Sequence, residues 1–341
     1  MSSQTSISYT SIFRVVAVLL ALFVAYVIRD VIGLLFVAIV IAAALDPFVD
    51  YLQKHKIPRS VSILVIFLIT LSLFSLVIVL LIPPISEQVG QLARNLPDYY
   101  EKVALGFNRL GSDGSGSSVP ATLPDALSSL SSNLAGATGG VFTTLTGIFG
   151  GLISLVSLLV IVFYLMVQED GIKYYVKQIV PEKYKKYSLD LFDRIQNKLG
   201  LWLRGQLILC LMVGLAVYIG LTILGVKYAL LLGFVAAITE IIPYVGPFIG
   251  AIPGVFIAFS DSLTKVLLVV LVYFIVQQLE NSVLVPKVMQ KSVGLDAVVV
   301  VVAILVGGSL GGIVGALLAV PVAVIVEVVA VDFINKKYPQ A

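Results

Sequence analysis

The sequence predicts an all-α integral membrane protein with about eight transmembrane segments, two of them broken by glycine and proline. Composition is the first observation: 59% of the 341 residues are hydrophobic and only 12% are charged, whereas soluble domains are charged at roughly a quarter of their positions. The second is that apolar runs recur along the chain, each near the roughly 20 residues that a helix needs to cross hydrocarbon. The third is that polar segments separate these runs.

Composition also disfavours several other classes of protein. The net charge is +3 with no block of Lys or Arg, so no nucleic-acid partner is expected. Cys210 and His55 are the only residues of their types, which excludes an internal disulfide and a Cys/His zinc site. Motifs of hydrolases and metalloproteases are absent from the sequence. We therefore expect no enzyme, no catalytic residue, no metal and no cofactor.

The apolar segments follow one another in a definite order. The first two are read as a helical hairpin, since no small-x-small cleavage site follows the first and the second begins almost at once. The third is expected to end at Pro83-Pro84, because proline cannot donate a backbone hydrogen bond. The predicted segments are 11–28, 31–49, 61–82, 141–167, 206–226, the interrupted stretch 228–259, 263–285 and the long stretch 295–331.

Polar regions divide the chain into five parts. The predicted parts are N-terminal transmembrane helices (1–85), an extracytoplasmic helical and Gly/Ser-rich region (86–140), a transmembrane helix (141–168), a cytoplasmic basic amphipathic region (169–205) and a transmembrane transport core (206–335). Region 169–205 holds eight Lys and Arg residues, and the longer region 86–140 holds three. Basic residues favour the cytoplasmic side. Both termini are therefore expected in the cytoplasm, in a multi-pass protein of the cell membrane.

Two points of this topology stay open. Lys287 and Lys291 fall on the outer side of an eight-crossing arrangement, which would be explained if one interrupted stretch is re-entrant and does not span. The basic aromatic region 169–205 either lies along the inner membrane surface, where anionic lipid attracts it, or owes its charge to orientation alone. Both interpretations place it in the same compartment.

The stretch "ITEIIPYVGPFIGAIPG" (238–254) contains six helix breakers in an apolar setting. In hydrocarbon every backbone polar group must be paired, so broken backbone is tolerated only where protein buries it or it lines a wet cavity. This segment is therefore expected to face the protein interior. The breakers are Pro243, Gly246, Pro247, Gly250, Pro253 and Gly254.

Glu240 makes the same stretch a candidate site. A charge at the bilayer centre costs roughly 2.5–3.5 kcal/mol even on lenient scales, so this carboxylate must be neutral, paired or wet. It either binds substrate or an ion beside the helix break, or only caps and holds the break.

A second polar cluster follows in "VQQLENSVLVP" (276–286). Gln277, Glu280 and Asn281 follow i, i+3, i+4 spacing and share one helix face, with Gln278 beside them and Pro286 after them. These groups either join Glu240 in binding a substrate or ion, or act as hydrogen bonds between helices.

The last apolar stretch carries Gly308, Gly312 and Gly315, followed by Pro321. Two Gly/Pro-broken segments in corresponding places suggest an internal repeat with a site between them. The alternative is close helix packing through small residues. Asp46 and Glu327 are expected to mark helix ends at the cytoplasmic interface.

These motifs resemble the autoinducer-2 exporter (AI-2E) family of membrane proteins. The segment order agrees over essentially the whole chain, and the motifs are specific over 205–325. The matching residues are the E-x-x-P-x-x-G-P run (Glu240, Pro243, Gly246, Pro247), the Q-Q-x-E run before a proline (Gln277, Gln278, Glu280, Pro286) and the glycine ladder with A-V-P (Gly308, Gly312, Gly315, Pro321).

The resemblance implies a secondary transporter of small molecules. Some relatives are associated with export of a furanone-type signal and others with sodium/proton exchange, and relatives resemble homo-oligomers, with the pentamer as one form. The family usually shows Gly and then His-Pro after the Gln/Glu helix, where this chain has Gln290, Asp296 and Ala297. A role that rests on that His does not carry over, although Asp296 would offer a proton-carrying carboxylate in its place.

Three functions remain in order of preference. The first is a proton- or sodium-coupled transporter, an exporter of a small polar molecule or a sodium/proton antiporter, with Glu240 or Glu280 as the titrating group. The second is a passive oligomeric channel, and the third is a membrane scaffold. No Walker motif is present, so direct drive by ATP is not expected. The expected partners are the lipid bilayer, a small molecule or ion, and further copies of the chain.

Overall fold

The computed structural model describes residues 9–110, 152–168, 171–289 and 295–337, and the part of the chain that it describes is helical and contains no strand. Five of these helices are long and apolar enough to cross a membrane, which confirms the all-α membrane class. Expectations for 111–151, Gln290 and Lys291 lie outside the described residues. The elements are α1 (Tyr9–Val27), α2 (Arg29–Lys54), α3 (Arg59–Leu110), α6 (Leu152–Val167), α7 (Gly171–Ile179), α8 (Glu182–Ile223), α9 (Ala229–Thr239), α10 (Gly246–Phe259), α11 (Leu263–Leu279), the π-helix η1 (Glu280–Leu284), α12 (Val285–Met289) and α13 (Ala297–Lys337).

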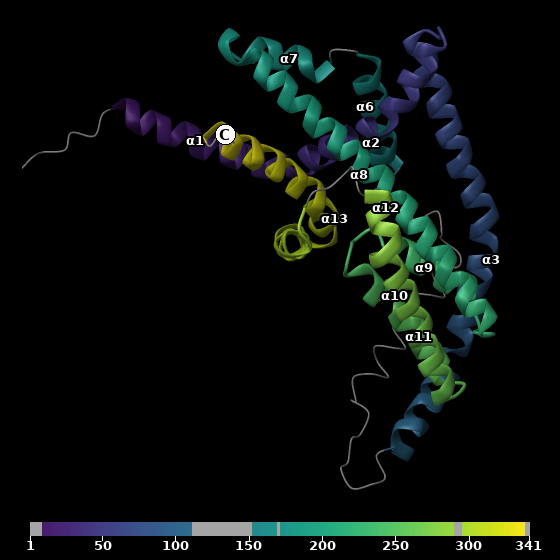
Figure 1. Ribbon diagram of the computed structural model, residues 1–341. Helices are drawn as coiled ribbons and strands as arrows, with labels where there is room; N and C mark the ends of the chain where they lie inside the picture. The colour runs from purple at the N-terminus through teal and green to yellow at the C-terminus, as the bar shows by residue number, and fades with distance from the viewer. Residues whose placement is uncertain (1–8, 111–151, 169–170, 290–294, 338–341) are drawn as a thin grey trace, which may run out of the picture.

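Helix α3 does not end at Pro83-Pro84 as expected but continues to Leu110. The two prolines remove two backbone donors, yet the residues after them keep helical spacing and bury an apolar face. Leu92, Leu96 and Tyr99 pack in one core cluster with α8 and α9. In Figure 1, α3 is the long blue helix that runs down one side of the molecule. Tertiary packing therefore outweighs the local preference of proline to end the helix.

Helix α8 is the central element, and three glycines let other helices approach its backbone closely. A Cβ on Gly200 would collide with the carbonyl of Ala43 in α2, and one on Gly214 would collide with α9. A Cβ on Gly220 would meet Val272 of α11 at 2.6 Å. The helix is continuous through residue 205, where the sequence suggested a boundary between a cytoplasmic region and the transport core.

The broken stretch 228–259 forms a helical hairpin. Helix α9 ends at Thr239, and α10 begins at Gly246 so close to it that a Cβ on Gly246 would collide with the Thr239 carbonyl. The chain then returns to the end where α9 began, because Lys265 Nζ donates to the Gly225 carbonyl at 3.0 Å. With 11 and 14 residues at about 1.5 Å each, neither arm reaches across about 30 Å of hydrocarbon. The hairpin is therefore re-entrant.

Helix α13 is sharply kinked at Gly311 and Gly312. Gly312 has φ +59° and so adopts the left-handed conformation that glycine accepts without strain. The two arms cross where Gly307 faces Gly315, since a Cβ on either would collide with the other's carbonyl oxygen. The sequence indicated Gly312 and Gly315 for close packing; Gly315 packs closely, whereas a Cβ on Gly312 would meet nothing within 4 Å. The kink at Gly311 lies four residues from Gly307 and four from Gly315, so these two glycines meet across it.

Helix α11 runs antiparallel to α8, which changes the expected place of Lys287. Val272 of α11 meets Gly220 near the end of α8, and Met289 of α12 meets Gly205 nearer its beginning. Lys287 therefore lies toward the N-terminal half of α8, the half that carries Arg194 and Lys198. A hairpin that does not cross the membrane places Lys287 on the same side as these basic residues, an arrangement that agrees with the positive-inside rule.

Candidate functional site

A cavity of about 100 Å³ lies where α8, the α9–α10 turn, η1, α12 and both arms of α13 meet. We call it the acid cavity. No Lys, Arg or His is found among the described residues that line it. Its polar and aromatic lining consists of Trp202, Gln206, Glu240, Tyr244, Glu280 and Asn281, and the rest of the wall includes Leu209, Pro243, Val285, Met289, Leu295, Val300 and Val320.

Glu240 is the most unusual residue of the acid cavity. It follows the last residue of α9 and is only 1% exposed. Neither of its carboxylate oxygens accepts a hydrogen bond from a fixed donor among the described residues; the Glu280 carboxyl is near enough to form one when the two acids hold a proton between them. Its backbone carbonyl, by contrast, accepts a hydrogen bond of 2.6 Å from Gln206 Nε2 of α8. The backbone at the helix break is therefore fixed, while the carboxylate is left open to the cavity.

Glu280 is the second buried acid of the cavity, 5% exposed. It interacts electrostatically with Glu240, and its Oε2 accepts a hydrogen bond of 3.1 Å from Gln277 Nε2. Glu280 also begins the π-helix, in which the Val285 N–H donates to the Glu280 carbonyl. Pro286 comes directly after this bond and has no N–H to continue the normal ladder. π-Helical turns inside α-helices are frequent at functional sites.

The α9–α10 turn presents a strained tyrosine to the cavity. Tyr244 has φ +62°, a conformation that bulky residues rarely adopt and that must be held by its surroundings. The turn satisfies much of its own backbone, since Ile242 N–H donates to Thr239 and Gly246 N–H donates to Ile242. The break faces the protein interior only in part: Glu240 and Gly246 are buried, whereas Tyr244 between them is 38% exposed.

The other predicted site residues are placed differently. Asn281 lines the cavity, and Gln277 reaches it through Glu280. Gln278 is exposed and does not line it. Asp296 is exposed and caps α13, because its Oδ1 accepts from the Val298 N–H at 2.8 Å.

The remaining predicted breakers do not line the cavity. Pro247 begins α10 and Pro253 lies inside it, where Gly250 packs against Ala236 of α9. Pro286 lies in α12, and Gly308, Gly312 and Pro321 lie in α13. Their expected role as structural breaks stays a prediction, and only Pro243 of the set lines the cavity.

Three polar or aromatic lining residues were not identified from the sequence. Gln206 carried a usable signal in the sequence, since it is an amide at the start of the apolar segment 206–226. In the structure it is buried, with 1% of its surface exposed. Trp202 and Tyr244 carried none, because aromatic residues are common near membrane interfaces and in cores.

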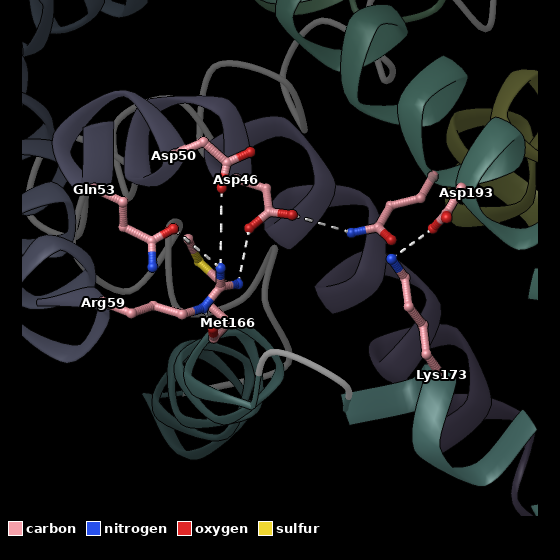
Figure 2. Close-up of polar contacts among 8 residues, drawn as sticks. Asp46, Asp50, Gln53, Arg59, Met166, Lys173 and Asp193 are labelled. Atoms are coloured by element: carbon pink, nitrogen blue, oxygen red, sulfur yellow. Dashed lines mark hydrogen bonds and ion pairs between the residues drawn. The ribbon is translucent and has the colours of Figure 1, made fainter. Parts of the chain in front are cut away.

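A second polar group, which we call the charged cluster, joins α2, α3, α6, α7 and α8 (Figure 2). Arg59 is its centre: Nη2 binds Asp46 at 3.2 Å, Nη1 lies 3.9 Å from Asp50, and Nε donates to the Met166 carbonyl at 3.0 Å. Beside it Lys173 pairs with Asp193 at 2.7 Å. Asp46 was expected to mark a helix end, but α2 continues past it to Lys54.

Further ion pairs tie the second arm of α13 to α8. Lys198 binds Glu327 at 2.8 Å, Arg194 binds Asp332 at 2.7 Å, and the Tyr187 hydroxyl also donates to Asp332. Glu327 therefore lies inside α13 in an ion pair, and it does not mark a helix end. Several basic residues of 169–205 serve this packing, in addition to any role in orienting the chain.

Comparison with known proteins places the chain in a family. The sequence model of the AI-2E transporter family matches residues 15–335. The chain is 35% identical over 300 residues to YueF of Bacillus subtilis, which carries a transport-protein name, and this match covers 82% of the chain and 80% of YueF. It is 24% identical over 272 residues to the AI-2 transport protein TqsA of Escherichia coli, covering 77% of the chain and 74% of TqsA. These matches, together with the motifs that surround the acid cavity, show that the chain belongs to the AI-2E family of membrane transport proteins.

Proposed function

We propose that this protein is a proton- or sodium-coupled secondary transporter that exports a small polar molecule across the cell membrane, with the acid cavity as its site. The observation that carries the proposal is the Glu240 carboxylate, which is buried, faces a cavity and has beside it no basic residue and no donor among the described residues except the second acid, Glu280. The family name and the relatives support transport in general. Cargo, direction and coupling are our inference.

The physical argument starts from desolvation. A buried ionised carboxylate without a partner is unstable by several kcal/mol, and Glu280 beside it adds like-charge repulsion when both are ionised. The cavity can therefore be closed to water only when a proton or a cation is bound. A site with this property exchanges one ligand for another, which is the basis of coupled transport.

The fold supplies elements whose movement could expose the cavity. The α9–α10 hairpin and the first arm of α13 are short helical segments that end at a turn and at a kink, respectively, and they meet the long helix α8 at the cavity. The hairpin is fixed at its open end by Gln88 Oε1, which accepts from the Leu231 N–H at 3.0 Å, and by Asn95, which donates to the Tyr228 hydroxyl at 2.9 Å. Its turn is fixed by the bond from Gln206 to Glu240.

Flux in proteoliposomes tests the proposal. The purified full-length protein is reconstituted with a pH-sensitive dye inside, and proton movement is followed after a sodium gradient or a panel of small polar metabolites is added. We expect Glu240→Gln to abolish coupled proton movement while the protein still folds and assembles. The amide is nearly isosteric and removes only the charge and the titration.

Glu327→Gln is the matched control, because it removes a carboxylate that is already paired with Lys198 outside the acid cavity. It should retain coupled flux per folded molecule. Unchanged coupling in Glu240→Gln would remove Glu240 from the mechanism and overturn the proposal.

Two alternatives are separated by the same preparation. A sodium/proton antiporter would move protons on a sodium gradient alone and show no counterflow with any metabolite. A passive channel would pass current without coupling, and a scaffold would move nothing; neither requires an unpartnered acid. We also propose that the chain forms homo-oligomers in the bilayer. Native mass spectrometry of the detergent-solubilised protein should then show one species whose mass is a whole-number multiple of the monomer mass.

A further inference from the structure

The wall of the acid cavity is divided between acid and apolar groups. Glu240 and Glu280 supply negative charge, and no base is found among the described lining residues to neutralise it. Most of the remaining wall is aliphatic, with Leu209, Val300 and Val320 as examples. A cavity of this kind attracts a cation, and it also binds a ligand more tightly when that ligand buries apolar surface against the wall.

Aromatic rings add to the same preference. Trp202, on α8 and 5% exposed, lines the cavity, and the strained Tyr244 lines it from the α9–α10 turn. The faces of Trp and Tyr rings attract cations, and quaternary ammonium groups are the ligands most often recognised in this way. Met289 contributes a polarizable thioether at the same wall.

Other small ligands fit this wall less well. A sugar-like polyol needs a hydrogen-bond partner for each buried hydroxyl, which the aliphatic side does not offer. An anion would be repelled by both carboxylates. A bare metal cation prefers oxygen ligands and gains nothing from the aliphatic and indole surfaces.

We infer that the cargo of the acid cavity is a small organic ammonium ion, with Glu240 as its counter-charge and Trp202 beside its alkyl groups. This inference rests on the proposed transport function and specifies its substrate class. Charge balance follows directly: two ionised carboxylates are neutralised by one ammonium ion and one proton, or by two protons. Releasing the ammonium ion and taking up a proton in its place exchanges one cation for one proton.

The sequence provides a direct probe of occupancy, because Trp202 is the single tryptophan of the chain. Tryptophan emission of the purified full-length protein is recorded during titration with choline chloride, with tetramethylammonium chloride and with 3,3-dimethylbutan-1-ol. The last compound has the shape of choline without its charge. Potassium chloride at matched ionic strength corrects for general salt effects, and sodium chloride is titrated separately because sodium is a candidate coupling ion.

We expect both ammonium ions to change Trp202 emission saturably and the neutral alcohol to leave it unchanged. Glu240→Gln should weaken choline binding at least about tenfold, which corresponds to about 1.4 kcal/mol. Equal binding of the neutral alcohol would overturn the inference, and so would the absence of a saturable response to either ammonium ion. Isothermal titration calorimetry with choline on Trp202→Phe measures binding without the fluorescent probe. We expect weaker but measurable binding, and the unfolding temperature of this variant shows whether it is folded. Glu327→Gln, which lies outside the acid cavity, should bind choline as the unmodified protein does.

The two proposals fail in different ways. If the protein couples sodium and proton movement through Glu240 but binds no ammonium ion, the cargo assignment is wrong and the transport proposal stands. If choline binds saturably and Glu240→Gln abolishes binding, yet no gradient drives flux, the cavity is a binding site and the transport proposal is wrong.

Discussion

The acid cavity and the charged cluster both gather carboxylates between helices, but they treat them in opposite ways. In the charged cluster Asp46, Asp50 and Asp193 each have a basic partner, and Glu327 and Asp332 are paired with α8 in the same manner. In the acid cavity Glu240 has no basic partner among the described residues, only the carboxyl of Glu280, which itself accepts a hydrogen bond from an amide.

This difference separates acids that hold helices together from an acid that is free to bind. A paired carboxylate has its lone pairs occupied, and removing its partner leaves an uncompensated charge. An unpartnered buried carboxylate destabilises the fold and persists only where function requires it. We therefore expect mutations in the charged cluster to lower stability more than flux, and mutation of Glu240 to lower flux more than stability.

The largest effect on stability is expected from Arg59→Met. The change leaves Asp46, Asp50 and the Met166 carbonyl without the guanidinium at a partly buried position, and we expect a loss of about 2 kcal/mol, below the 3–5 kcal/mol of fully buried pairs. Thermal unfolding followed by a thiol-reactive dye measures it, because Cys210 is the only cysteine of the chain. Glu240→Gln, its counterpart in the acid cavity, should leave the unfolding temperature unchanged or raise it. A destabilised Glu240→Gln beside a stable Arg59→Met would reverse the comparison.

An intermediate effect is expected from Gln206→Leu. The substitution leaves the buried Glu240 carbonyl without its 2.6 Å donor, which costs about 1–3 kcal/mol, and it frees the turn that presents the carboxylate. We expect a lower unfolding temperature together with weaker coupled flux. Gln196→Leu removes an amide of the charged cluster, whose bond to Asp46 is 3.4 Å long, and should leave flux intact. If both variants lose flux equally, the role of Gln206 in placing Glu240 is refuted.

The smallest effect is expected at the pair of Lys198 and Glu327. A double-mutant cycle with Lys198→Gln and Glu327→Gln should give a coupling free energy of about 0.5–1 kcal/mol, since both side chains are partly exposed. The charge-reversed double variant, Lys198→Glu with Glu327→Lys, should recover stability lost by either reversal alone. A coupling of zero would show that the arm of α13 is held by apolar packing instead.

Much of the fold followed from the sequence because membrane constraints are strong. Apolar runs identified the spanning helices, and the breakers of 238–254 located a break that faces the interior in part. The continuation of α3 past Pro83-Pro84 could not be predicted, since it depends on residues 85–99 packing against α9. The close pair of Gly307 and Gly315 was missed for a similar reason: it depends on where the chain kinks, and spacing along one helix does not show that.

The candidate site was only partly accessible from the sequence. Glu240 and Glu280 were identified because charges at membrane depth are costly wherever they face. Their shared cavity and the position of Gln206 required the turn geometry, which brings together residues 34 and more positions apart. Gln278 shows the limit of motif reasoning: it is adjacent to Gln277, and the helix directs it outward.

The re-entrant hairpin of α9 and α10 has a consequence for how such proteins can change. Its two arms leave and rejoin the bundle at one end, so adding or removing a helical turn in both arms shifts the depth of Glu240 without inverting the sidedness of α11 or of any later helix. A complete crossing has no such freedom, because losing it would turn the rest of the protein over. The depth of the binding position is thereby separated from the threading of the chain, and relatives can vary the first while keeping the second.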